Sequence, residues 1–228
     1  MKTYKLYLES GPQMKTTYVH VPELMGCMLN AATTEAALDA TPDVIRAYLR
    51  FMARAGEAVD PGDQIRTKVI EHTTEGGFLG SRFLPTDAQP LPPRESDKLM
   101  QRLDALHGEL RRITSGVDRR KLDAAPAKGR AIRRILVHVC SEGGYLRSVT
   151  GASRIQREAD EGKIDPLDAL DRLHALELAR LRSMDADERR GVIMRGQSPW
   201  SARAAVRRML EHAWEHYLEI AERLGKQP

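Results

Sequence analysis

Alternation of apolar and polar positions near the N-terminus predicts short β-strands. Tyr4–Leu8 alternates in this way, and Thr16–Val21 is a run rich in β-branched residues. Both patterns are typical of strands. Cys27–Ala31 predicts a third strand and Ile65–Glu71 a fourth. Between the third and the fourth the apolar positions take a helical period, so the expected order of elements is β-β-β-α-β.

The helix in this region is expected to begin near Thr33 and to end before Gly56. Threonine is favoured at helix N-termini, because its hydroxyl accepts a hydrogen bond from a backbone amide that lacks a partner in the helix. Pro42 lies inside the helical pattern. Since proline has no amide donor and clashes with the preceding turn, we expect it to kink or restart this helix.

The second half of the chain has a helical period throughout. One seam of apolar residues steps by four and three, which is the spacing of a helix in a bundle; it consists of Leu99, Leu103, Leu106, Leu110 and Ile113. A second helix is expected over about 130–150, and a third begins at Pro166, because proline suits the first turn of a helix. Ser201 is expected to cap a fourth helix that runs to Leu224 and ends at Gly225. Four helices without a strand pattern predict a four-helix bundle.

A proline-rich segment separates the two regions. Pro85, Pro90, Pro92 and Pro93 fall within ten residues, and such a composition favours extended backbone with few apolar side chains to bury. The sequence therefore predicts an α+β protein of two domains. We expect a small α/β domain over residues 1–84, a linker over 85–95 and the helical domain over 96–228.

Composition places the chain among ordinary globular proteins. Of its 228 residues 41% are hydrophobic and 30% are charged, and no apolar run has the length of a bilayer span. The net charge is +4, and the basic residues of the second half alternate with acids at helical spacing. Solvated helix faces explain them better than a nucleic-acid surface does. Cys27 and Cys140 form no CxxC motif. We expect a cytoplasmic protein without a nucleic-acid or membrane partner.

Histidine spacing supplies the candidate chemistry. His212 and His216 are four residues apart, so on a helix they lie one turn apart on one face, and this face is apolar. His138 lies on the apolar stripe of the second helix. Imidazoles removed from water need partners for their ring nitrogens, and three that face inward can share one metal ion. These three histidines are therefore candidate ligands of a divalent transition metal. His107 and His174 stand alone beside leucines and are expected at the rim or the surface.

Two other interpretations of these residues are open. Three core histidines can hydrogen-bond separately to carboxylates such as Glu142 and Glu215. The segment from His212 to His216 also spells H-x-x-E-H, a zinc-protease signature in which Glu215 is the general base. Only twelve residues follow His216, which leaves little chain to supply a third ligand. With a metal on the three histidines, Glu142 and Glu215 are instead candidates for orienting a ligand or accepting a proton.

Residues 95–225 resemble the DinB family of four-helix proteins. The matching residues are Ile135, Leu136, Val137, His138 and Glu142 in the second helix, and Ser201, Ala202, Arg203, Met209, Leu210, Glu211, His212 and His216 in the last. The resemblance implies that the three histidines are metal ligands and that nickel or zinc is the usual occupant. It also implies an up-down-down-up bundle with a long crossover over 150–165. Some members of the superfamily are thiol-dependent transferases or isomerases.

Residues 1–80 are similar to HicB, an antitoxin-type domain with a β-β-β-α-β fold. The matching stretch is Tyr18–Cys27, followed by Thr34 and Ala37 at the start of the helix. Met25 stands where the family often has proline, and the helical region replaces the DNA-binding element that usually follows. The predicted strands lack the inward acidic pairs that two-metal nuclease chemistry requires. This half is expected to be a binding or dimerisation module.

These observations leave two functions open. Three histidines leave coordination positions free, as in catalytic metal sites. This predicts a metal-dependent enzyme, a thiol-dependent transferase or a hydrolase, that acts on a small-molecule thiol or electrophile. The alternative is a non-catalytic, antitoxin-like regulator that binds a protein partner through the first domain and uses the metal for structure or sensing. A homodimer is expected.

Overall fold

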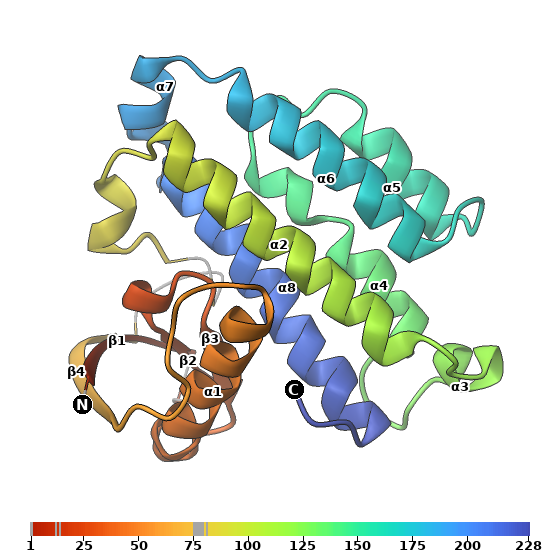
Figure 1. Cartoon of the computed structure of the whole chain (residues 1–228), viewed down its shortest axis with the longest axis horizontal. Coiled ribbons are helices and arrows are strands. Elements are labelled where there is room, and N and C mark those ends of the chain that lie inside the picture. Colours follow the sequence, from red (N-terminus) through yellow and green to blue (C-terminus); the bar gives the residue numbers. More distant parts are fainter. Residues whose placement is uncertain (1, 12, 14, 75–79, 81) are drawn as a thin grey trace. The chain divides into compact units, whose positions relative to one another are not determined.

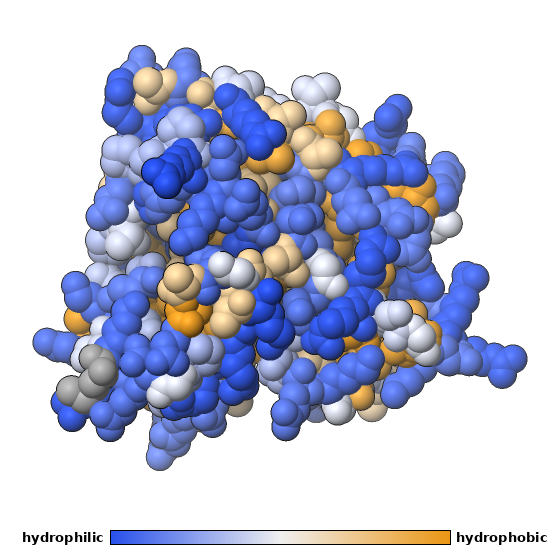
Figure 2. All heavy atoms as spheres, in the orientation of Figure 1, coloured by the Kyte–Doolittle hydropathy of each residue, from blue (hydrophilic) through white to orange (hydrophobic). Residues whose placement is uncertain are grey.

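The computed structural model describes residues 2–11, 13, 15–74, 80 and 82–228 of the chain. They form a mixed α/β protein with a small N-terminal sheet and C-terminal helices (Figure 1). The chain divides into two compact units, Met1–Gln89 with Val192–Trp200 and Pro90–Gly191 with Ser201–Pro228. Among the described residues no helix is long and apolar enough to cross a membrane. The face drawn in Figure 2 is mainly hydrophilic, with apolar residues in scattered groups.

The first unit contains a four-stranded sheet and one long helix. Its main elements are β1 (Lys2–Ser10), β2 (Thr17–His20), β3 (Met28–Ala31), α1 (Thr34–Arg54) and β4 (Ile65–Thr73). The strand order is β3-β2-β1-β4; β1 pairs in parallel with β4, and the other two pairings are antiparallel. Two short 3-10 helices, η2 (Pro22–Leu24) and η3 (Pro85–Ala88), and the hairpin of β5 (Ile193–Arg195) and β6 (Ser198–Trp200) complete this unit. The predicted order of three strands, a helix and a strand is present.

The alternating pattern at the N-terminus corresponds to the buried face of β1. Tyr4, Leu6 and Leu8 are all buried, and α1 packs against β2, β3 and β4. The Thr33 hydroxyl accepts a hydrogen bond from the Ala36 amide at 3.1 Å, as a helix N-cap does. The helix runs through Pro42 without restarting, so the prediction of a restart there was wrong. The apolar face of α1 is packed on the sheet over its whole length, and this packing outweighs the one lost hydrogen bond.

The proline-rich segment is more ordered than its composition predicts. Its first residues form η3, in which the Leu84 amide donates to the Asp87 carboxylate at 2.8 Å. Leu84 and Leu91 are fully buried. Two leucines and an aspartate cap therefore hold the segment in place, while Pro85, Ala88–Pro90, Pro92 and Pro93 are exposed, as its composition predicts.

The second unit is built from helices. Four of them pack on one another: α2 (Pro93–Thr114), α4 (Ile132–Val139), α6 (Pro166–Arg182) and α8 (Ala202–Leu224). The others are α3 (Arg119–Asp123), α5 (Ala152–Asp160), α7 (Ala186–Arg190) and the 3-10 helix η4 (Glu142–Tyr145). Both α2 and α4 pack against α6 and α8. Figure 1 shows α2 and α8 running in one direction and α4 and α6 in the opposite one.

The second helix differs from its prediction. It was expected to reach residue 150, but α4 ends at Val139, and η4 follows it. Gly143 and Gly144 lie in η4, and glycine is a poor helix former. The expected crossover over 150–165 carries a further helix, α5, which the periodicity analysis missed because only Ile155 and Ala159 of its residues are buried apolar ones.

The last helix has the predicted ends. The Ser201 hydroxyl accepts a hydrogen bond from the Ala204 amide at 3.0 Å. Gly225 has a φ of 65°, the left-handed conformation that ends many helices and that glycine adopts without steric cost. Both ends of α8 are therefore encoded locally, and this helix carries two of the candidate ligands.

Candidate metal centre

Three histidines from two helices meet inside the second unit. His138 lies in the last turn of α4, and His212 and His216 lie one turn apart on α8. One ring nitrogen from each lies within 4.8 Å of the other two, and the ring centroids are 4.7–5.0 Å apart. Nitrogen ligands at 2.0–2.1 Å from a tetrahedral ion are about 3.3 Å from one another. The three rings, here called the histidine triad, are therefore close enough for small side-chain rotations to bring their nitrogens onto one shared ion.

The protonation state of two histidines of the triad is the one that binds a cation. Burial, together with the nearby charges of His216 and Arg130, lowers the pKa of His138 to about 4. Burial and the same kind of neighbours hold the pKa of His212 well below its usual value. Both rings are therefore neutral at pH 7, and the neutral imidazole is the form that binds a metal.

One buried ring nitrogen of the histidine triad lacks a hydrogen-bond partner among the described residues. Within the described part of the chain, Nδ1 of His212 is buried and has no hydrogen-bond partner. Buried polar atoms in folded proteins are almost always paired. Three imidazole nitrogens, one of them orphaned, are a donor set that fits a divalent transition metal.

The carboxylate of Glu219, which the sequence analysis did not identify, orients one ring of the triad. Nδ1 of His216 lies 2.9 Å from Oε2 of Glu219, and Oε1 of Glu219 accepts from Arg223 at 2.6 Å. The hydrogen bond with His216 lowers the pKa of Glu219, although burial opposes this. A carboxylate at Nδ1 fixes the tautomer and the rotation of the ring and leaves Nε2 as the ligand atom. The spacing of three residues on one helix was the signal that could have revealed Glu219.

Glu142 does not lie beside His138, where the sequence analysis expected it. Its Oε1 is 2.7 Å from Nε2 of His107, and both side chains are buried. The α-helix ends at Val139, so the chain turns and Glu142 leaves the face that carries His138. His107 was expected at the rim or the surface; that prediction was wrong, because its partner comes from a distant segment that no local pattern reveals.

Glu215 is the second carboxylate proposed from the sequence. It is half-buried on α8, next to His216. Burial raises its pKa, while the charges of His216 and Arg208 act against this. A carboxyl group with a raised pKa is suited to proton exchange near neutral pH. Its position keeps it a candidate proton acceptor close to the triad.

His107 and Glu142 belong to a second group of polar side chains, here called the inner acid cluster, in which three members are buried and His174 is half-buried. It comes from α2, η4 and α6, and its members are His107, Glu142, His174 and Glu177. The rings of His107 and His174 are 5.8 Å apart. Burial and the charge of Glu142 raise the pKa of Glu177 well above its usual value. Ionisation of both carboxyl groups is therefore unfavourable, because two adjacent buried carboxylates repel each other.

Fixed positive charge borders the triad on α8. Arg207 and Arg208 both donate to Oε2 of Glu211, at 2.6 and 2.9 Å, and all three side chains are buried. The guanidinium of Arg208 lies 5.3 Å from the ring centre of Tyr145, and this ring is 5.8 Å from that of His212. The charge of Arg208 acts at the triad, where it helps to lower the pKa of His212.

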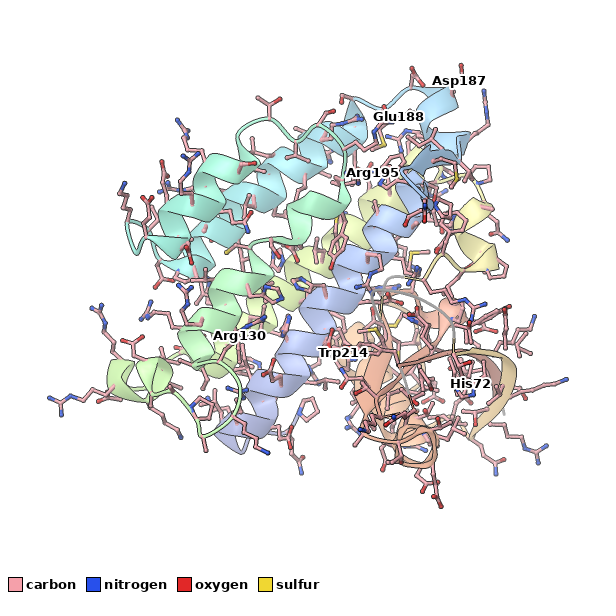
Figure 3. The ribbon with its side chains drawn as sticks, turned by 180° about the vertical axis from the view of Figure 1, so that it is seen from behind. His72, Arg130, Asp187, Glu188, Arg195 and Trp214 are labelled. Carbon is pink, nitrogen blue, oxygen red and sulfur yellow. The ribbon has the colours of Figure 1, made fainter. Side chains whose placement is uncertain are left out.

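A pocket of about 590 Å³ reaches the triad from one side. His138 forms part of its wall and is half-buried, whereas His212 and His216 are buried. The other lining residues come from α4, α5 and the segment before α4; they are Arg130, Arg134, Val137, Ser153, Gln156, Arg157 and Asp160. Figure 3 labels Arg130 where the chain enters α4. The pocket therefore gives a small molecule a route to the edge of the triad.

Comparison with known proteins identified no relative of this chain. No family model, no curated protein and no solved structure matches the chain. The likeness to DinB and HicB domains therefore stays a prediction from motifs. The site rests on the geometry and chemistry of its own residues.

Proposed function

We propose that the second unit binds one divalent transition metal, zinc or nickel, on His138, His212 and His216, and that the protein is a metal-dependent enzyme. The observation that carries the proposal is the triad itself: three ring nitrogens within 4.8 Å, one of them from a residue in the wall of an open pocket. The opposite directions of the helix pairs α2/α8 and α4/α6 support the resemblance to the up-down-down-up bundle of the DinB family.

The donor set favours an open rather than a closed site. Three neutral imidazoles leave the charge of a divalent ion uncompensated and a coordination position free. Bound there, the ion supplies a Lewis acid that polarises a substrate oxygen or lowers the pKa of a water or thiol ligand. Glu219 orients His216, and Glu215 accepts a proton beside it. A thiol-dependent transferase or a hydrolase is the reaction class that these parts suit.

Metal analysis tests the proposal. Protein purified without chelator is expected to carry about one equivalent of zinc or nickel, since one ion satisfies the triad. His212→Ala and His216→Ala are expected to lose most of it, and His174→Ala serves as the control because its ring lies in the inner acid cluster. Absence of metal from the wild-type protein, or equal loss in the control, contradicts the proposal.

Access to the metal separates an enzyme from a sealed site. Cobalt-substituted protein is expected to develop a sulfur-to-metal charge-transfer band when a small thiol is added, because thiolate is a soft anionic ligand. His138→Ala is expected to weaken the band, since this histidine joins the triad to the pocket. A spectrum that stays unchanged with thiol, cyanide and azide contradicts the enzyme and favours a regulator.

One observation supports this second function. Strand β4 lies at the edge of the sheet and is exposed along most of its length, and Val69 and Ile70 are exposed apolar side chains on it. Strand edges are sites of pairing with another chain. In this second function, the first unit is an antitoxin-like module that binds a protein partner or a second copy, and the metal serves structure or sensing.

Light scattering of wild-type protein and Ile70→Lys tests whether β4 pairs with a second copy. The expected result is a wild-type dimer that this variant dissociates, and a wild-type monomer at all concentrations contradicts the homodimer.

A further inference from the structure

The walls of the pocket beside His138 carry an unusual share of arginine. On the α4 side, Arg134 and His138 lie one turn apart on one face of the helix, and Arg130 lines the pocket from the segment just before α4. On the α5 side the lining residues have the spacing of one helix face as well; they are Ser153, Gln156, Arg157 and Asp160. Two short helices thus present their polar faces to the same space, with the triad at its edge.

The charges in this space do not balance. Nη1 of Arg134 lies 2.8 Å from Oδ1 of Asp160, so these two residues neutralise each other. Arg130 and Arg157 form no ion pair within the described residues of the chain. Their two positive charges face a pocket that a divalent ion would make more positive still. Such a concentration of one sign of charge in a concave space attracts ions of the opposite sign.

We propose that this pocket selects a small anionic substrate, one that carries a carboxylate or phosphate group, and holds that group on Arg130 and Arg157. The inference rests on the proposed function, because it assigns the substrate class of the same site. Guanidinium groups match the oxygens of carboxylate and phosphate in two-pronged hydrogen bonds, which neutral ligands cannot reproduce. The substrate's reacting end then lies toward His138.

The other features of the pocket suit a small molecule. Its volume of about 590 Å³ is that of a site for a ligand of metabolite size. Ser153 and Gln156 add neutral hydrogen-bonding groups, and Val137 gives an apolar wall. The Arg134–Asp160 pair joins α4 to α5 across the pocket lining. Arg130 and Arg157 are therefore specificity-determining residues rather than general surface charges.

Two small thiols, mercaptosuccinate and thioglycerol, test the inference on cobalt-substituted protein. Mercaptosuccinate carries two carboxylates, and thioglycerol is neutral. Titration of the charge-transfer band is expected to give a dissociation constant about tenfold lower for mercaptosuccinate, and added salt is expected to reduce this difference. Equal constants for the two thiols overturn the inference while leaving the metal site standing.

Variants test whether Arg130 and Arg157 cause the preference for the anionic thiol. Arg130→Gln and Arg157→Gln are each expected to weaken mercaptosuccinate about fivefold, because each removes one charged hydrogen-bond donor. Binding of thioglycerol is expected to stay within about twofold, since it does not use these groups. Arg154→Gln is the matched control, because Arg154 lies on α5, is exposed and does not line the pocket. A loss in this control as large as in Arg157→Gln also overturns the inference.

An experiment on metal-free protein tests this inference independently of the proposed function. Calorimetry of chelator-treated protein with succinate and with inorganic phosphate is expected to show weak binding that Arg157→Gln abolishes. The stronger of the two probes identifies the anionic group as carboxylate or phosphate. If wild-type protein binds neither probe, the inference fails; if it binds one but holds no metal, only the proposed function fails.

Discussion

Nδ1 of His216 lies 2.9 Å from Oε2 of Glu219, three residues further along α8. One helix therefore supplies two candidate ligands and the carboxylate that orients one of them. Because the spacing is local, it forms as soon as α8 folds. The orientation of the third ligand, His138, depends on α4.

Glu219→Gln is expected to weaken metal binding by a factor of about 10–100, which is the usual effect of removing a carboxylate that orients a histidine ligand. Competition with a chromogenic chelator measures it. Glu222→Gln is the control, because Glu222 is an exposed acid on the same helix. Equal affinities of the two variants would show that Glu219 is an ordinary surface carboxylate.

Breaking the buried contact between His107 and Glu142 is expected to destabilise the second unit. Glu142→Ala leaves His107 buried without its partner, and the loss of one member of a buried ion pair costs about 3–5 kcal/mol of unfolding free energy. Urea unfolding of metal-free protein gives the value. Glu161→Ala, at an exposed position, is expected to change it by less than about 0.5 kcal/mol. A loss of less than about 1 kcal/mol in Glu142→Ala speaks against a structural pair.

The inner acid cluster predicts that stability falls as pH rises above about 6.5, the unfolded pKa of histidine. Burial lowers the pKa of His107, but the charge and hydrogen bond of Glu142 raise it more, so it lies above its usual value. The pKa of Glu177 is also raised, by burial and by Glu142. In this window the folded state therefore holds protons that the unfolded state has released, and each such proton lowers the unfolding free energy by up to about 1.4 kcal/mol per pH unit.

Of the other shifted groups, Glu215 also has a raised pKa and adds to this decline. His138 and His212 have lowered pKa values, so their contribution to stability is complete above about pH 6.5, their unfolded pKa. Burial raises the pKa of Cys140 to about 12, and that thiol adds a further decline only above its unfolded pKa of about 8.5. Urea unfolding of chelator-treated protein at several pH values measures the slope. Glu177→Gln is expected to flatten it, and an unchanged slope would mean that Glu177 is ionised in the folded protein.

The cap of α8 is expected to contribute measurably to stability. Ser201→Ala removes the acceptor for the Ala204 amide and is expected to cost about 1 kcal/mol of unfolding free energy. Ser201→Gly is expected to cost only a few tenths, because glycine is tolerated at an N-cap. Chemical unfolding ranks the two variants. Equal losses would show that the hydroxyl does not act as a cap.

Local patterns determined the elements of this protein. The alternation at Tyr4–Leu8, the cap at Thr33 and the serine and glycine at the two ends of α8 all act between residues close in sequence. A two-residue or four-residue period and a capping hydrogen bond need no information from the rest of the chain. The same holds for His212 and His216, whose shared face follows from helix geometry alone.

Only the tertiary structure decided which distant groups meet. Glu142 pairs with His107 because α4 ends at Val139 and the chain then turns toward α2. Helix α5 and its Arg157 face the pocket because the crossover folds back on α4. These contacts join segments tens of residues apart, and loop paths and packing set them. The spacing of apolar residues within one segment does not determine which other segment packs against it.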